Sequence, residues 1–214
     1  MSRPPMFRSK NDFILPIVRD KSVLDLGCVD YGKGLTHDPT WLHGAITALA
    51  AKTVGIDCDT DGIAPLFEKG FDIRCANVED FRLDEQFDVV VAGDIIEHVS
   101  NPGAVLDCIR KHLTESGMCL LTTPVTVNFM RLVELIFTGE IYAHPEHTCW
   151  FTSGVLAELV RRHGLTIDSL CYINDARLYY PLLSRWGVPR LIDMALCRIH
   201  PVFCETFGAV LRKA

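Results

Sequence analysis

The sequence lacks paired cysteines. Its nine cysteines stand singly along the chain, with no C-x-x-C pair. Zinc ribbons and disulfide frameworks are built from such pairs, so the spacing argues against both kinds of site. A reduced cysteine inside an apolar run, such as Cys119, behaves as a small buried hydrophobe. This usage fits a reducing compartment, and we predict a cytoplasmic protein.

An excess of positive charge is also missing. Lysine and arginine total 21 against 27 aspartates and glutamates. A protein that binds nucleic acid needs basic side chains to neutralise phosphates, so we expect no nucleic-acid partner.

Long apolar runs are absent too. The most apolar later stretch, 129–137, is interrupted by Arg131 and Glu134 and is shorter than the ~20 residues that span a bilayer. The first five residues lack the apolar core of a secretory signal. We therefore predict no transmembrane segment and no secretion.

No internal repeat, low-complexity tract or linker-like stretch divides the 214 residues. The length suits one domain, since domains commonly run about 100 to 200 residues. We expect a single domain over 1–214, with a core at about 20–125, further elements at about 126–152 and a C-terminal helical extension at about 176–214.

The chain contains short β-branched runs that alternate with longer segments of helical period. Strands are predicted at 22–27, 53–57, 71–76, 87–92, 118–123 and 165–172. This alternation is typical of βαβ units. We predict an α/β fold, a Rossmann-like three-layer sandwich with a mostly parallel sheet and helices on both faces.

Helical spacing is found between these strands and after the last. Helices are predicted at 41–51, at 61–69, from the Asn101 cap to about 113, and from a cap at Thr152 or Ser153 to the glycine stop at Gly164. Residues 177–214 mix apolar and basic side chains, which predicts one or two amphipathic C-terminal helices. These helices pack on the domain or contact a partner or membrane surface.

Four strand exits carry polar or glycine residues. In an open parallel sheet, ligands bind beyond the carboxyl ends of the strands. The candidate cofactor-binding residues at these exits are Asp25, Gly27, Cys28, Asp57, Cys58, Asn77, Val78, Glu79, Gly93, Asp94 and Ile95.

These residues, in this order, resemble class I S-adenosylmethionine-dependent methyltransferases, especially the small-molecule branch with Glu-His after the fourth strand. The resemblance covers about residues 23–173. It implies that the core at about 20–125 binds the cofactor and that the elements at about 126–152 form the acceptor side and lid. It implies that Asp25 and Gly27 hold the amino-acid end of S-adenosylmethionine and that Asp57 holds the ribose. Residues 77–79 would meet the adenine, and 93–95 would line the methyl-transfer mouth. The sequence is also similar to methyltransferases of polysaccharide, sugar and natural-product pathways. This similarity implies a small-molecule or glycan acceptor as the partner.

The main competitor is a nicotinamide-dependent oxidoreductase, whose cofactor also needs a glycine turn and an acid after the second strand. A carboxylate at Asp25 would attract an ammonium group but repel a pyrophosphate. Val29 also stands where G-x-G-x-x-G requires its second glycine. The span from Gly27 to Asp57 exceeds the ~20 residues typical of such folds, so we interpret 32–41 as an insertion near the site.

Three histidines are candidates for chemistry. Residues 144–152 resemble the H-x-x-x-F-[ST] entry to the late helix of this branch, over the substrate side of the cleft. Methyl transfer to a hydroxyl benefits from a base, and histidine titrates near neutral pH. We predict His147 or His98 as the base, with His144 third; for His98 a packing role is the alternative. Residues 126–143 would form a lid or acceptor wall.

A metal centre is a weaker alternative. Asp94, Glu97 and His98 resemble the acid-x-x-E-H ligands of some methyltransferases acting on hydroxyls, with His144 or His147 completing the shell around magnesium or manganese. Because Glu-His also occurs as plain scaffold in this branch, no metal is our default. Two non-catalytic alternatives also remain: a binding module without chemistry, and a domain docked to a larger complex through its C-terminal helices.

Overall fold

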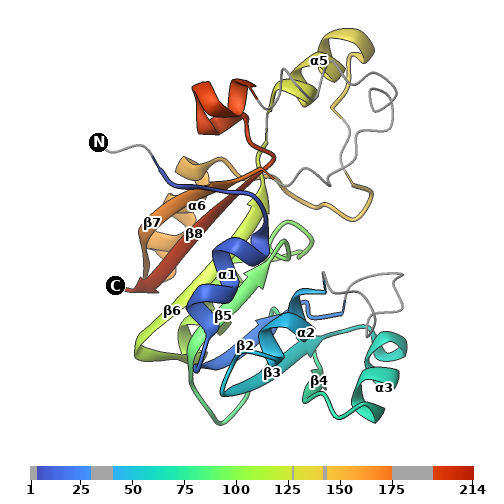
Figure 1. The fold of residues 1–214 in the computed structure, drawn as a ribbon, viewed down its shortest axis with the longest axis vertical. Coiled ribbons are helices and arrows are strands. Elements are labelled where there is room, and N and C mark those ends of the chain that lie inside the picture. Colours follow the sequence, from blue (N-terminus) through green and yellow to red (C-terminus); the bar gives the residue numbers. More distant parts are fainter. Residues whose placement is uncertain (1–3, 30–40, 127, 142–143, 175–194) are drawn as a thin grey trace.

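A computed structural model describes residues 4–29, 41–126, 128–141, 144–174 and 195–214. Its centre is one eight-stranded sheet (Figure 1) with the order β1-β7-β8-β6-β5-β2-β3-β4. The strands are β1 (Met6–Phe7), β2 (Ser22–Leu26), β3 (Lys52–Asp57), β4 (Ile73–Cys75), β5 (Phe87–Gly93), β6 (Leu113–Pro124), β7 (Leu165–Ile173) and β8 (Thr206–Lys213). All pairings are parallel except those of β8, which runs antiparallel to both β6 and β7. The six predicted strands and the mostly parallel sheet are confirmed.

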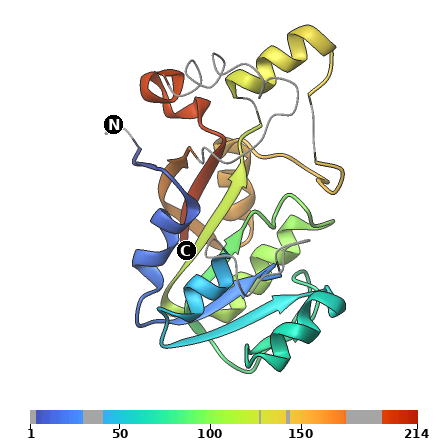
Figure 2. The same ribbon diagram turned by 45° about the vertical axis from the view of Figure 1, so that its right-hand side comes forward.

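Helices cover both faces of the sheet, as predicted. On one face lie α1 (Lys10–Val18) and α2 (Leu42–Thr47), whose Ile14 and Ile46 share a buried cluster with Val89 of β5. On the other lie α4 (Pro102–His112) and α6 (Ser153–Arg162), where Ile109 and Leu156 pack into the larger cluster. Figure 1 shows α1 in front of the central strands, and the turned view of Figure 2 shows it at their left. The strands between these layers are buried on both sides, which explains their nearly continuous apolar sequence.

The remaining helices lie at the margins of the sheet (Figure 1). α3 (Thr60–Glu68) lies beside β4, and α5 (Phe129–Thr138) lies beyond the end of β6. No helix in the described ranges is long and apolar enough to cross a membrane.

The predicted helix ends are confirmed. The Asn101 side chain accepts the amide of Ala104, and the Thr152 hydroxyl accepts the amide of Val155. Gly164 has a φ of 67°, the left-handed backbone that stops α6.

The prediction of C-terminal helices is wrong for residues 206–213. Thr206–Lys213 forms β8 between β6 and β7, while 195–199 is helical and Pro201–Phe203 is one 3₁₀ turn. The error has a physical reason. Residues 206–211 are buried in the sheet, so their apolar run has no alternation to distinguish it from a helix. Residues 175–194, which carry the rest of this prediction, lie outside the described residues.

Ser22 and Asp88 join the starts of β2 and β5. The Ser22 amide and hydroxyl both donate to Asp88 Oδ2, at 3.0 and 2.8 Å, and the Asp88 amide donates to the Ser22 hydroxyl at 3.0 Å. These donors hold the pKa of the Asp88 carboxyl below its usual range.

Asp88→Asn is expected to lower stability by about 1 kcal/mol at neutral pH, because the acceptor loses its charge. A carboxyl whose pKa is lowered on folding stabilises the folded protein at pH values above its unfolded pKa. This stabilisation is lost as the pH falls through the folded pKa. The difference between wild type and variant should therefore shrink below about pH 4. Urea unfolding at pH 7 and pH 3 measures this; an unchanged difference would contradict it.

Candidate active site

The turn after β2 requires glycine. Gly27 has a φ of 73°, and its amide donates to the Ile56 carbonyl at 2.8 Å. A Cβ on Gly27 would lie 2.8 Å from Ile95 Cδ1. The tips of β2 and β5 are therefore in contact here, as expected for a turn that lets backbone approach a ligand.

Asp57 joins the first two strand exits. Its Oδ2 accepts the Val29 amide at 2.8 Å, and its Oδ1 accepts the Asp59 amide at 3.0 Å. The residue is 9% exposed. A carboxylate has about four lone-pair sites, so two amides leave capacity for ribose hydroxyls.

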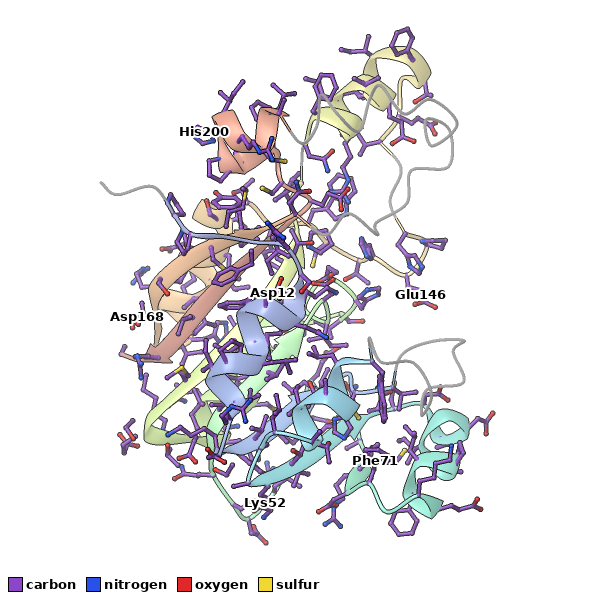
Figure 3. The ribbon with its side chains drawn as sticks, viewed as in Figure 1. Asp12, Lys52, Phe71, Glu146, Asp168 and His200 are labelled. Atoms are coloured by element: carbon purple, nitrogen blue, oxygen red, sulfur yellow. The ribbon has the colours of Figure 1, made fainter. Side chains whose placement is uncertain are left out.

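Asp25 is buried and contacts a histidine that the sequence analysis did not select. His43 Nδ1 of α2 lies 2.8 Å from Asp25 Oδ2. The His43 ring lies 5.5 Å from the Trp41 ring and 5.9 Å from that of Phe71, centroid to centroid; Figure 3 marks Phe71 near β4. Trp41 in turn donates to the Cys28 carbonyl at 2.9 Å. Asp25, the acid expected to meet the ammonium group of the cofactor, is therefore held by His43 from a helix that covers the sheet.

The two cysteines at these exits have different surroundings. Cys28 is buried, and a Cβ on Gly55 would lie 2.6 Å from its sulfur. Cys58 is exposed. Burial first, and then nearby carboxylates, raise the pKa of both thiols, so both remain neutral at neutral pH.

The third exit forms a hydrogen-bonded turn. Asn77 Oδ1 accepts the Glu79 amide at 3.0 Å, and Glu79 Oε1 accepts the Ser100 amide at 2.9 Å. Val78 packs into the main core. The turn is therefore rigidly connected to the loop that precedes α4.

The fourth exit contains a strained acid. Asp94 has a φ of 51°, and its Oδ1 accepts the Thr122 hydroxyl at 2.7 Å. Its Oδ2 forms an ion pair with Lys10, the first residue of α1. Next to it, a Cβ on Gly93 would lie 3.4 Å from Leu42 Cδ2. Sequence reasoning missed Lys10, because no strand exit precedes it and α1 itself was not predicted.

Glu97 is an unusual buried acid. Its Oε2 accepts the Thr123 hydroxyl at 2.9 Å, while Oε1 is buried and has no hydrogen-bond partner in the described part of the chain. Burial, followed by the Asp94 carboxylate, raises the pKa of Glu97 to about 8. The side chain is therefore mainly protonated at neutral pH.

The three predicted histidines form one cluster. The ring centroids of His98 and His147 are 4.6 Å apart, those of His144 and His147 5.5 Å, and those of His98 and His144 5.8 Å. His147 Nδ1 is buried, and none of the residues that the structure describes forms a hydrogen bond with it. Burial and the neighbouring imidazoles lower the pKa of His147 to about 4, and lower that of His98 as well. Both rings are neutral at neutral pH.

One carboxylate approaches the cluster. Glu146 Oε2 lies 4.0 Å from His98 Nδ1. Figure 3 marks Glu146 on the segment between α5 and α6.

Of the acid-x-x-E-H residues in the metal alternative, His98 alone belongs to a group of potential metal ligands in the described structure. Among the described residues, the group whose ligating atoms all lie within 4.8 Å of one another consists of His98, His144 and His147. Asp94 and Glu97 are not part of that group. The predicted insertion at 32–41 lies outside the described residues apart from Trp41, and residues 127, 142 and 143 of the predicted lid are also outside them.

Residues 3–170 match the family model described as a methyltransferase domain. The chain belongs to this methyltransferase family. A ubiquinone biosynthesis O-methyltransferase from Nitrobacter winogradskyi is 35% identical over 184 residues, which cover 80% of this chain and 65% of that protein. The matched chain thus spans about two thirds of the relative's length.

Solved structures show the same fold. An S-adenosylmethionine-dependent methyltransferase from Archaeoglobus fulgidus superposes with a TM-score of 0.61 at 17% identity, covering 96% of this chain and 91% of that one. A Burkholderia thailandensis N-methyltransferase solved with S-adenosylhomocysteine has a TM-score of 0.56 at 19% identity, covering 92% and 72%. The predicted Rossmann-like methyltransferase fold is confirmed. S-adenosylmethionine is the cofactor of this class, and the Gly27 turn and Asp57 suit it.

Proposed function

We propose that this methyltransferase transfers a methyl group from S-adenosylmethionine to a hydroxyl of a small molecule. The observation that supports it most is the cluster of His98, His144 and His147 beside the fourth strand exit, where the resemblance puts the methyl-transfer mouth. Its relative from Nitrobacter winogradskyi is named as an O-methyltransferase, which agrees with a hydroxyl acceptor.

The residues at the strand exits would bind and orient the cofactor. Gly27 would let the backbone approach the cofactor, and Asp57 would accept hydrogen bonds from the ribose hydroxyls. Asp25 would face the ammonium group of the cofactor, and His43 would hold the Asp25 carboxylate in place. The cofactor supplies an electrophilic methyl group, so alignment and removal of the acceptor proton are what the protein must provide.

His147 is the proposed base. Its low pKa keeps the ring neutral and able to accept a proton, and no residue in the described ranges forms a hydrogen bond with its Nδ1. His98, with its centroid 4.6 Å away, offers a second acceptor for the same proton. The low basicity of His147 suits acidic hydroxyls, such as phenols, better than sugar hydroxyls.

His147→Ala is expected to lower kcat by about tenfold in chelator-treated protein, less than the 10² to 10⁴ of full general-base catalysis, because His98 can substitute. The loss should be largest for weakly acidic phenols and should vanish for dinitrophenols, which are already ionised at neutral pH. Formation of S-adenosylhomocysteine across such a series measures this.

His163→Ala is the matched control, since that half-buried histidine at the end of α6 has its Nδ1 3.1 Å from Asp107 Oδ1 and does not belong to the cluster. It should leave every rate unchanged. An equal loss in His147→Ala for all acceptors, whatever their pKa, would sink the base assignment. No product from any hydroxylated acceptor, despite S-adenosylmethionine binding, would sink the proposed function.

A further inference from the structure

His98, His144 and His147 come from two separate segments. His98 follows β5, and the other two belong to the segment between α5 and α6. Each offers one nitrogen, and the three nitrogens lie within 4.8 Å of one another. We propose that these three histidines bind a zinc-type divalent ion with an open coordination position.

The backbone holds the two segments in register. The Thr148 amide donates to the Glu97 carbonyl at 2.8 Å, and the Thr148 hydroxyl donates to the Val99 carbonyl. Within the second segment, the His147 amide donates to the His144 carbonyl at 2.9 Å. The histidine spacing is therefore determined by hydrogen bonds on either side of His98 and does not depend on the histidine side chains themselves.

The spacing needs only a small adjustment to fit an ion. Zinc–nitrogen bonds of about 2.0–2.1 Å in a tetrahedral site place the nitrogens about 3.3 Å apart. Closing from 4.8 Å moves each ring by roughly 1 Å, which rotation about the side-chain bonds provides.

One polar atom of the cluster also lacks a partner. Among the described residues, no group forms a hydrogen bond with the buried Nδ1 atom of His147. A buried ring nitrogen without a hydrogen bond is costly, and a metal ion bound in the cluster would satisfy it.

The donor set selects the class of metal. Imidazole suits zinc, copper, nickel and cobalt, whereas magnesium and calcium prefer oxygen ligands. The carboxylates of the magnesium alternative do not belong to the histidine group. Asp94 pairs with Lys10 and Thr122, and Glu97 accepts the Thr123 hydroxyl through Oε2. Three protein nitrogens leave a position open in a tetrahedral site, as in catalytic zinc sites.

The role of the ion rests on the proposed function. An acceptor hydroxyl in the open position would have its pKa lowered by the metal, as a bound water does. In the metal-loaded protein the histidines act as ligands, and the base role of His147 belongs to the metal-free protein. The site would favour acceptors whose hydroxyl reaches His98 from the cofactor side.

The test uses the full chain, without a histidine tag and freed of metal by a chelator. One equivalent of Co²⁺ should bind and give the visible absorption bands of a tetrahedral site, and Zn²⁺ should displace it. His144→Ala and His147→Ala should each weaken Co²⁺ binding by at least about tenfold, since even indirect partners of metal ligands cost 10 to 100-fold. His163→Ala should bind as wild type does.

Failure of this inference is separable from failure of the proposed function. Binding of S-adenosylhomocysteine, measured on the same samples, should be unchanged in every histidine variant, which shows that they fold. Absence of stoichiometric Co²⁺ binding, or binding that neither cluster variant weakens, would overturn the site while leaving hydroxyl methylation intact. A Co²⁺ site lost in both variants would support it even if no acceptor is methylated.

Discussion

Asp57→Ala is expected to weaken binding of S-adenosylmethionine by roughly 100-fold. Two hydrogen bonds from ribose hydroxyls to a charged oxygen contribute about 3 kcal/mol together, and each 1.4 kcal/mol is tenfold in affinity. The free energy of unfolding should fall by about 3 kcal/mol as well, since the amides of Val29 and Asp59 lose their charged acceptor. Calorimetric titration and urea unfolding give the two values.

Two further variants separate binding from stability. Asp57→Asn keeps one oxygen for an amide, so it should recover part of the stability but little of the cofactor affinity. Asp59 caps the start of α3, where its Oδ1 accepts the Gly62 amide at 3.1 Å, and Asp59→Ala removes this cap. That loss costs about 1 kcal/mol of stability and should leave cofactor affinity unchanged. Equal cofactor affinity in wild type and Asp57→Ala would exclude the ribose role.

Gly27→Val is expected to reduce cofactor affinity by roughly 100-fold through the backbone. A β-branched residue at a φ of 73° is a steric outlier. Left-handed backbone alone costs an L-residue about 1–2 kcal/mol, and the new Cβ would lie 2.8 Å from Ile95 Cδ1. The turn must move to relieve this contact, and the cofactor site moves with it.

Gly70→Val supplies the matched control. Gly70 also has a left-handed φ, 88°, but a Cβ there meets nothing within 4 Å. The control should therefore lose a similar amount of stability from the backbone while binding the cofactor as wild type does. If both variants bind the cofactor equally well, the contact between the β2 turn and Ile95 has no part in the site.

The fold was predictable where one local signal decided each element. Runs of Val, Leu and Ile in β2, β3 and β5 predicted buried parallel strands, and caps such as Asn101 and Thr152 predicted where helices start. β8 was not predictable in this way. Its apolar residues are buried between β6 and β7, which are both distant in the chain: Leu211 pairs with Cys119, and Lys213 pairs with Leu165. Nothing local in the sequence records that pairing.

The sequence by itself determined the order of the strand exits and the residue types on them, because strand tips and glycine turns are local features. It therefore determined the class of cofactor through Asp25, Gly27 and Asp57. It also selected the three histidines individually. Only the tertiary structure decided which side chains meet: His43 on Asp25, Lys10 on Asp94, and His98 beside His144 and His147. Such contacts join residues from separate elements, and their distances depend on how whole layers pack, which no spacing in the chain encodes.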